Sequence, residues 1–343
     1  MTVDAIRETD LPLPLLRRGK VRDVYEAGPD ALLMVASDRV SAFDCVLPQP
    51  IPHKGEVLTL VTAWWLTRLD AAEPHHLLSV DPAEIAGHLP ILKDFPERWA
   101  RRSMLVRRTE PIPVECVVRG YLAGSAWREY RDRGTLAGEP LPEGLRQSSP
   151  LPSPLFSPAT KAEEGHDENI TFGEVEERLG TGLARELRNR SLRLYTEGAA
   201  VAARKGVLLA DTKFEFGRLP DGQVLLIDEV MTPDSSRYWP EEEYAEGRSQ
   251  PSLDKQPIRD WLDALEEWDK SPPPPDLTPE VVRAATERYR EIFRLLTGSE
   301  LENWRLPGFE WDPESFEFAP DGPGRSESSG APGAGGSQTR REG

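Results

Sequence analysis

Residues 209–217 carry charged side chains at alternate positions, the spacing expected if a β-strand turns them toward one face. Asp211, Lys213 and Glu215 would share that face, and Asp228 would lie close to them on the next strand of a hairpin. Two carboxylates beside a lysine are groups that can hold Mg²⁺ and the phosphates of a nucleotide. A cross-strand ladder of ion pairs on an exposed surface is the alternative, which the apolar neighbours make less favoured.

A second candidate is the segment Gly19-Lys20-Val21-Arg22, which combines a glycine turn with two cations. The backbone N–H groups of such a turn, together with a cation, can cover the phosphates of a nucleotide. The segment matches neither the GxxxxGK[ST] phosphate loop nor the GxGxxG motif. On its own it therefore fits an ordinary hairpin turn with exposed cations equally well.

Arg119 stands at the end of a predicted strand, and small residues lead from it to a predicted helix that Ser125 could cap. A helix N-terminus offers free N–H groups and a partial positive charge, so it forms a candidate anion site with Arg119. A plain connection between a strand and a helix explains the pattern as well.

Three further segments concentrate polar residues near predicted strand ends, namely residues 37–44, 160–169 and 232–239. Turn chemistry alone explains the first of them about as well as function does. In the other two, His166 and Arg237 are the residues that we expect to contact a ligand. His166 has no second His or Cys nearby, so it is not predicted to be a metal ligand.

The composition limits the classes of function. The chain has 343 residues and a net charge of −17, which argues against a general nucleic-acid binder because phosphate neutralisation needs a basic face. Only eight lysines accompany 34 arginines, so lysines in compact polar motifs are informative. The longest apolar runs are far too short to span a bilayer. Two cysteines form no disulfide framework, and a reduced cytoplasm is the expected compartment.

Periodicity and turn residues predict a strand-rich first third followed by a mixed region. The predicted strands are 19–26, 31–36, 102–107, 113–118, 207–211, 214–217 and 224–228. The predicted helices are 58–69, 124–133, one beginning at Thr171 with a capping box, 183–204, 259–268 and 279–296. Residues 138–158 are predicted to be mostly irregular, and a disordered tail is predicted from about residue 320.

Together these segments resemble the phosphoribosylaminoimidazole-succinocarboxamide synthase (SAICAR synthetase) family, in order from about Leu15 to Leu262. The densest matches are 113–125 and 209–217, and 157–169 and 252–256 resemble the longer form of the enzyme. The resemblance implies a two-lobed α+β fold. We expect an antiparallel-sheet N-terminal lobe (1–109) with a kinase-like or ATP-grasp-like ATP-binding region, a mixed α/β C-terminal lobe (110–319) and a disordered tail (320–343).

The resemblance also implies a reaction: ATP, 5-aminoimidazole-4-carboxylate ribotide (carboxyaminoimidazole ribotide) and L-aspartate give SAICAR, ADP and phosphate in purine biosynthesis. An acyl phosphate is the simplest activated carboxylate, and direct amine attack followed by phosphorylation of the adduct stays open. The implied cofactors are ATP and Mg²⁺. No nucleic-acid partner and no membrane association are expected.

Site residues follow from the same resemblance, motif by motif. The ATP-binding residues are Gly19, Lys20, Val21, Arg22, Lys213, Glu215 and Asp228, with Glu215 and Asp228 as the metal ligands. The expected catalytic residues are Lys213, Asp234 and Arg237. The expected substrate-binding residues are Asp38, Ser41, Asp44, Arg119, Ser125, Lys161, His166, Asp167, Ser236 and Arg237.

Small departures from the family pattern are His53, Ser157 and Ala159, and none of them removes a charged group. The leading alternative is a small-molecule kinase that uses the same ATP cradle, with Asp234 as its general base. An ATP-binding scaffold without activity is less favoured because the charged set is intact. Dependence of ADP release on both the ribotide and L-aspartate distinguishes the ligase from the kinase.

Overall fold

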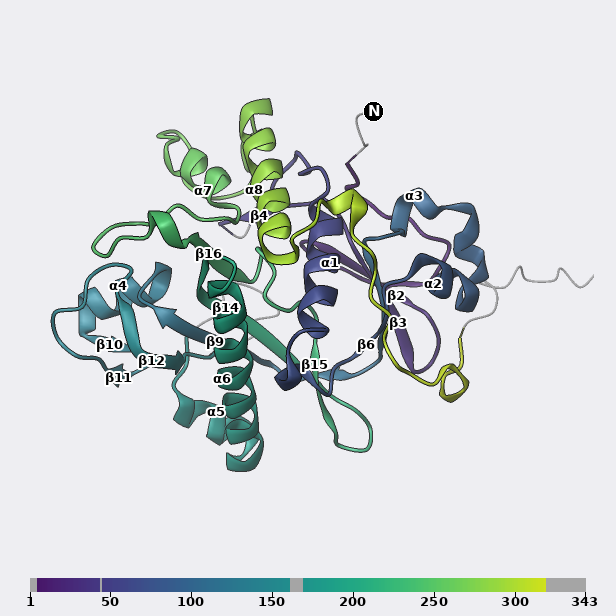
Figure 1. The fold of residues 1–343 in the computed structure, drawn as a ribbon, viewed down its shortest axis with the longest axis horizontal. Helices are drawn as coiled ribbons and strands as arrows, with labels where there is room; N and C mark the ends of the chain where they lie inside the picture. The colour runs from purple at the N-terminus through teal and green to yellow at the C-terminus, as the bar shows by residue number, and fades with distance from the viewer. Residues whose placement is uncertain (1–4, 44, 161–168, 319–343) are drawn as a thin grey trace, which may run out of the picture.

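The computed structural model describes residues 5–43, 45–160 and 169–318 (Figure 1). Antiparallel sheets and helices from both halves of the chain build it, so the predicted α+β class is confirmed. The predicted tail, from residue 320, lies outside the described residues. Within the described part of the chain, no helix is long and apolar enough to cross a membrane.

An antiparallel sheet near the N-terminus has the strand order β1-β2-β3-β7-β6. Its strands are β1 (Leu15–Arg18), β2 (Arg22–Glu26), β3 (Ala31–Ala36), β6 (Leu77–Ser79) and β7 (Ser103–Arg107). Successive side chains along its strands point to opposite faces of the sheet, and each face packs into a different hydrophobic core. Leu33 and Val35 pack with Trp99 in one core, and Met104 and Val106 belong to the other. The predicted glycine turn at Gly19 and Lys20 is confirmed, and it joins β2 to β1, a strand that the sequence did not predict.

The larger sheet is built around the long strand β14 (Val207–Arg218). The other strands of this sheet are β8 (Glu110–Pro111), β9 (Val114–Tyr121), β12 (Pro150–Phe156), β13 (Ala159–Thr160), β15 (Val224–Ile227) and β16 (Ser236–Pro240). The sequence predicted two short strands where β14 runs unbroken. The strand continues because residues 211–214 pair in register with 116–119 of β9.

The predicted irregular stretch 138–158 is corrected in part, because β12 pairs with β9 there and β11 (Glu139–Pro140) pairs with β10 (Thr135–Leu136). Prolines are tolerated in β12 because it lies at the edge of the sheet. A further two-stranded pair joins β4 (Ser41–Ala42) to β5 (Cys45–Val46).

Helices cover the sheets and meet between them. Their bounds are α1 (Lys54–Leu66), α2 (Pro82–His88), α3 (Pro96–Trp99), α4 (Gly124–Arg133), α5 (Phe172–Leu179), α6 (Thr181–Ala203), α7 (Gln256–Asp263) and α8 (Pro279–Thr297). Helix α6 packs on β9, β12 and β14 (Figure 1), and α1 contacts both the N-terminal sheet and α8. The capping box at Thr171 and Glu174 is confirmed. Ser125 is not the cap of α4, which begins at Gly124 with Ala123 before it.

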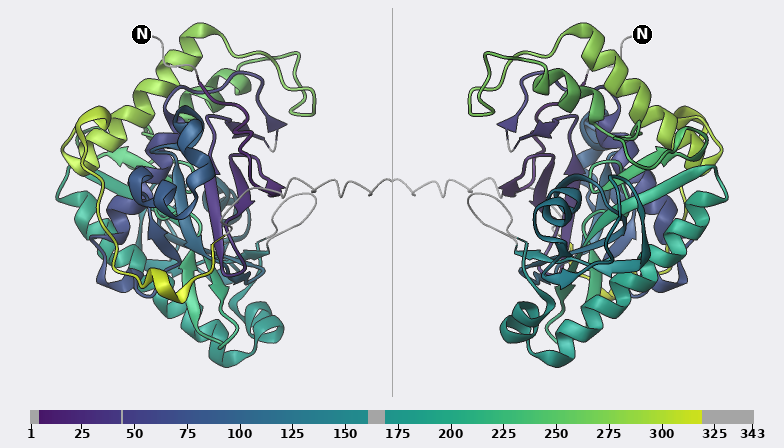
Figure 2. Two further views of the ribbon diagram at one scale, coloured as in Figure 1. Left: turned by 90° about the vertical axis from the view of Figure 1, so that its right-hand side faces the viewer. Right: turned by 90° about the vertical axis from the view of Figure 1, so that its left-hand side faces the viewer.

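After α8 the chain returns to the N-terminal sheet. Figure 1 shows this segment in yellow, running past α1, and Figure 2 shows it in side view. Trp311, Phe316 and Phe318 pack against the core that lies under α2 and α3. The indole Nε1 of Trp311 donates to Glu84 Oε1 at 3.0 Å. The predicted division at 109/110 assigns this segment to the second lobe, yet it packs on the first sheet because its aromatic residues need an apolar face.

Candidate active site

A cavity of about 500 Å³ lies between the N-terminal sheet and the hairpin of β14 and β15. Its apolar wall comes from β2, β3, β7 and β15 through Val24, Leu32, Met34, Val106 and Ile227. Nine residues predicted for the site line it: Gly19, Lys20, Val21, Arg22, Ser41, Lys213, Glu215, Asp228 and Asp234. Segments far apart in the chain therefore meet at one apolar-walled cavity rimmed by charge.

The turn at Gly19 is tightly folded over one side of this cavity. The N–H of Gly19 donates to the carbonyl oxygen of Arg22 at 2.7 Å, and a Cβ at Gly19 would come within 2.8 Å of that oxygen. Glycine is therefore required for the close approach. The buried side chain of Arg39 holds the turn from behind, since its Nη2 donates to the Gly19 carbonyl at 3.0 Å.

Lys213 lies between two carboxylates on the larger sheet. Its Nζ is 2.7 Å from Glu115 Oε1 and 2.8 Å from Glu215 Oε1. Burial acts to lower the pKa of Lys213, but Glu215, Glu115 and Asp228 together raise it well above the ordinary value. Lys213 is therefore a fixed positive charge at this site and not a proton acceptor.

Arg22 joins the N-terminal sheet to the end of β15. Its Nη1 is 3.0 Å from Asp228 Oδ1, and its Nη2 is 2.7 Å from Glu229 Oε2. Burial raises the pKa of Asp228 although Arg22 opposes the shift, and Glu215 and Glu229 add to the rise. Asp228 also has a left-handed backbone, with φ 61°, which is uncommon outside glycine and turns its carboxylate out of the strand pattern.

The donor set suits a magnesium ion that also binds a nucleotide. Glu215 pairs with Ile227 across the hairpin, so the carboxylates of Glu215 and Asp228 face the same cavity. Among the residues that the structure describes, no group of three His, Cys, Asp or Glu side chains could hold a metal by itself. Two carboxylates are sufficient for Mg²⁺, because substrate phosphates and water normally supply its other ligands.

Asp234 is held rigidly at the base of the cavity. Its Oδ2 accepts from Lys54 Nζ at 2.7 Å, and its Oδ1 accepts from the hydroxyl of Tyr289 at 2.5 Å. Burial acts to raise the pKa of Asp234, but Lys54, Lys255 and the Tyr289 hydrogen bond lower it below the ordinary value. The carboxylate thus stays ionised and engaged, which makes it a poor proton acceptor.

A second hollow of about 540 Å³ is lined by Ser125 and Arg237, among other residues. Arg119 lies behind it, and its guanidinium donates to Ser157 Oγ at 2.8 Å, Asp211 Oδ2 at 3.1 Å and Ser125 Oγ at 3.1 Å. Arg237 also bonds Asp211. The structure therefore brings Arg119, Ser125 and Arg237 together, with Arg237 at the surface of the hollow and Arg119 bracing it.

Ser236 and Asp38 point into the protein. Ser236 is buried, and its Oγ donates to Thr212 Oγ1 at 2.8 Å. Asp38 lines neither hollow, and its predicted place beside the substrate stays a prediction. It is buried and accepts from Gly55 N at 2.9 Å and Arg102 Nη1 at 3.0 Å, because a buried carboxylate needs donors. The predicted residues Asp44, Lys161, His166 and Asp167 lie outside the described residues.

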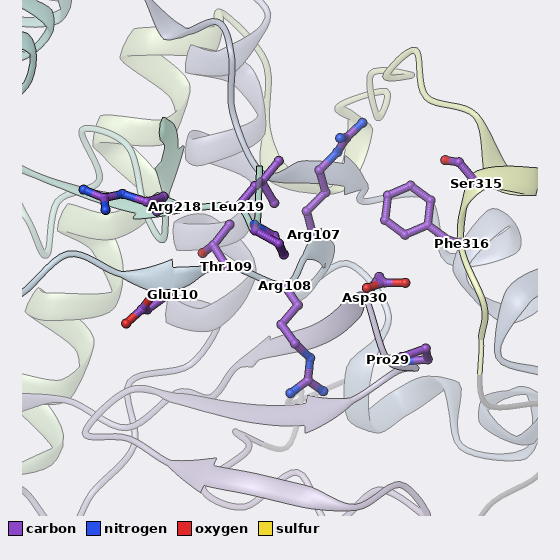
Figure 3. Close-up of a pocket in the computed structure, with 11 residues that line it drawn as sticks. Pro29, Asp30, Arg107, Arg108, Thr109, Glu110, Arg218, Leu219, Ser315 and Phe316 are labelled. Atoms are coloured by element: carbon purple, nitrogen blue, oxygen red, sulfur yellow. The ribbon is translucent and has the colours of Figure 1, made fainter. Parts of the chain in front are cut away.

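A third hollow, of about 780 Å³, adjoins the first cavity at Arg107 and Thr109. In Figure 3 the guanidinium groups of Arg107, Arg108 and Arg218 point in different directions. Arg107 instead lies over the ring of Phe316, 5.4 Å from its centroid. The hollow thus has no convergent set of polar groups, although it is larger than the other two.

Several residues of the site were not predicted from the sequence. They are Arg39, Lys54, Glu115, Glu229, Lys255 and Tyr289. Lys54 and Lys255 carried one signal, since both are among the few lysines and occur in compact polar segments. The buried contacts of Glu115 and Tyr289 depend on strand register and helix packing, which no local pattern reveals.

Comparison with known proteins gives consistent results. A sequence profile for SAICAR synthetase matches residues 15–275. A phosphoribosylaminoimidazole-succinocarboxamide synthase from Thermodesulfovibrio yellowstonii is 49% identical over 295 residues, covering 86% of this chain and 99% of that protein. The protein of the same name from Bordetella petrii is 51% identical over 280 residues, covering 81% and 94%.

Solved structures agree with the sequence relatives. The SAICAR-synthase from Saccharomyces cerevisiae, complexed with SAICAR, is similar with a TM-score of 0.78 and 40% identity, covering 85% of this chain and 97% of that one. A Type-2 SAICAR synthetase in complex with ADP has a TM-score of 0.61 at 22% identity, covering 83% and 98%. At that identity the second likeness concerns the fold alone.

Proposed function

The chain belongs to the SAICAR synthetase family, a family of purine-biosynthesis ligases, and from this premise we propose how its own residues carry out the reaction. The proposed reaction joins L-aspartate to 5-aminoimidazole-4-carboxylate ribotide and converts ATP to ADP and phosphate. The contact of Lys213 with Glu115 and Glu215, opposite the Gly19 turn, is the observation that carries the proposal. The kinase alternative has no support in the relatives described above, which share the synthase name.

ATP binds in the first cavity under this proposal. The apolar wall from Val24 to Val106 suits the adenine ring, and the turn at Gly19 and Lys20 suits the phosphates. Mg²⁺ would be held by Glu215 and Asp228, where it would neutralise charge on the phosphates. The guanidinium of Arg22, which donates to Asp228, would then also interact with the nucleotide phosphates, because Asp228 and the phosphates compete for the same hydrogen-bond donors.

The ribotide carboxylate must be activated before an amine can attack it. In the proposed sequence, a carboxylate oxygen attacks the γ-phosphorus, the bond to the β-phosphate oxygen breaks, and ADP leaves. Lys213 stabilises the transferring group because it is a fixed positive charge in a partly buried site. The aspartate nitrogen then bonds to the carbonyl carbon, and phosphate leaves with the electrons of the broken carbon–oxygen bond.

The second hollow would hold the phosphate of the ribotide. Arg237, whose side chain is 29% exposed, lines this hollow, and Ser125 supplies a hydroxyl near the start of α4. Arg119 positions both groups through Asp211 and Ser125, so we assign it an indirect role. The planar fork of an arginine suits a phosphate better than a point charge does.

The remaining predictions keep the form of proposals. We propose a two-lobed arrangement with a kinase-like or ATP-grasp-like ATP-binding region, a cytoplasmic location and small-molecule substrates, without a nucleic-acid partner. The net charge of −17 supports the last point. Ser41, which lines the first cavity, is assigned to the substrates, and Asp44, Lys161, His166 and Asp167 stay predictions.

An ADP-release assay with each substrate omitted in turn tests this function. We expect ADP release only when ATP, the ribotide and L-aspartate are all present with Mg²⁺. Release with ATP and the ribotide alone, at the rate of the complete mixture, would contradict the ligase reaction. Mass spectrometry of the product identifies the succinocarboxamide directly.

A further inference from the structure

Amide formation releases a proton from the aspartate nitrogen, and a group at the cavity must take it. Asp234 was the acidic candidate from the sequence, but Lys54 and Tyr289 occupy its two oxygens at 2.7 and 2.5 Å. The side chain of Asp234 is only 6% exposed, so solvent offers no easy route for replacing those partners. Asp234 is therefore poorly placed to accept the proton.

Lys255 lines the same cavity as Lys213 and Asp234, immediately before helix α7. Its neighbour Asp254 binds elsewhere, since it accepts from Gln256 N at 2.7 Å and from Arg259 Nη1 at 3.2 Å. Within the described ranges, the Lys255 amine has no hydrogen bond or ion pair. Lys213 differs sharply, because two carboxylates fix its charge.

The charged groups that act most strongly on the Lys255 amine are Asp234, Arg259, Lys54 and Asp254. Arg22, Lys213, Glu215, Asp228 and Glu229 line the same cavity. Burial lowers the pKa of Lys255 most, Arg259 and Lys54 lower it further, and Asp234 and Asp254 oppose this without reversing it. A lysine in such surroundings loses its proton more readily than one in water, which is how buried lysines become general bases.

We propose, resting on the ligase reaction above, that Lys255 is the catalytic residue that takes the proton from the aspartate amine. The nitrogen lone pair forms the carbon–nitrogen bond, the bond from the carbonyl carbon to the phosphate-bearing oxygen breaks, and phosphate leaves with that electron pair. The nitrogen's proton passes to Nζ of Lys255, which becomes an ammonium and returns the proton to solvent after the product leaves.

Lys255→Arg separates proton transfer from charge, because a guanidinium stays protonated and cannot act as a base. We expect Lys255→Arg and Lys255→Ala each to lower kcat about 100-fold or more, in line with the usual contribution of a general base. The KM values for ATP and the ribotide should stay within about twofold of those of the unsubstituted chain, because the substitutions impair proton transfer and not substrate binding. Lys93→Ala, at an exposed lysine that lines none of the three hollows, is the matched control and should match the parent chain.

Rescue by small primary amines tests the role without relying on loss of activity. Added to Lys255→Ala, they should restore turnover in proportion to the free-base form and more strongly as amine basicity rises. Rescue also demonstrates that the variant is folded. Wild-type kcat for Lys255→Arg, unchanged kcat for Lys255→Ala, or rescue that follows the protonated amine would each overturn the proposal.

Assays of the unsubstituted chain distinguish failure of this proposal from failure of the proposed ligase function. If ADP release by the unsubstituted chain does not depend on both the ribotide and L-aspartate, the proposed ligase function is contradicted, whatever the variants show. If that dependence holds and Lys255→Arg is fully active, only the role of Lys255 fails.

Discussion

Nη1 of Arg22 lies 3.0 Å from Oδ1 of Asp228, and this contact joins residues 206 positions apart in the chain. Arg22 belongs to β2 of the N-terminal sheet, whereas Asp228 follows β15 of the larger sheet. The same guanidinium reaches Glu229, so one cation balances two largely buried carboxylates. Under the proposed function, the stability of the cavity and its affinity for a metal nucleotide would therefore depend on the same pair.

Replacing Arg22 by Met should lower the free energy of unfolding by about 3 kcal/mol, because removal of one partner leaves a buried charge uncompensated. Urea unfolding without nucleotide measures the loss. Asp228→Asn in the same chain should recover part of it, since one uncompensated carboxylate is then gone. Arg131→Met is the control, because its pair with Asp132 is exposed and contributes little. Strictly additive losses in the double variant would contradict the coupling.

Lys213→Met should lower kcat about 100-fold, because this is the usual loss when one preorganised group that stabilises negative charge in the transition state is removed. ADP release at saturating substrates measures the effect. Lys205→Met offers a control on an exposed lysine just after α6 and should leave kcat unchanged. A fall limited to the KM for ATP would assign Lys213 to binding and not to the chemical step.

Nine of the residues predicted for the site line this cavity, and the family resemblance is what grouped them. Strand alternation predicted only that Lys213 and Glu215 share a face, and turn chemistry predicted only the glycine turn at Gly19. Several helices were also predictable to within a few residues, and the capping box at Thr171 was predicted correctly. Helices α2 and α3 were not predicted, and the predicted cap at Ser125 was wrong.

What escaped prediction depends on long-range packing. Tyr289 reaches Asp234 from helix α8, and nothing near either residue signals their contact. The return of Trp311 to the N-terminal sheet likewise depends on an apolar face exposed by α2 and α3. The strand β12 was missed because its prolines favour irregular structure, and only its place at a sheet edge tolerates them.

Arg237→Lys should raise the KM for the ribotide about tenfold, the effect of losing one charge-assisted hydrogen bond to a phosphate. The KM for ATP should not change, because Arg237 lines the second hollow and not the first. Arg119→Lys should also raise the ribotide KM at least several-fold, since a lysine cannot reach Asp211 and Ser125 together. Steady-state kinetics with each substrate varied separately tests both, and a change confined to the KM for ATP would contradict this assignment.

Asp234 should make stability depend on pH in the acid range. Its folded-state pKa lies below the ordinary value of 3.8, so its contribution is fully present above that pH and is lost as the pH falls below it. Asp234→Asn removes the charge that Lys54 needs, and we expect it to lower the free energy of unfolding by about 3 kcal/mol at pH 7. The difference between the parent chain and this variant should shrink as the pH falls from 4 toward the acid limit, because the parent carboxylate also becomes neutral there. Urea unfolding at several pH values measures this difference, and a gap that stayed constant down to the acid limit would mean that Asp234 does not stabilise the fold through its charge.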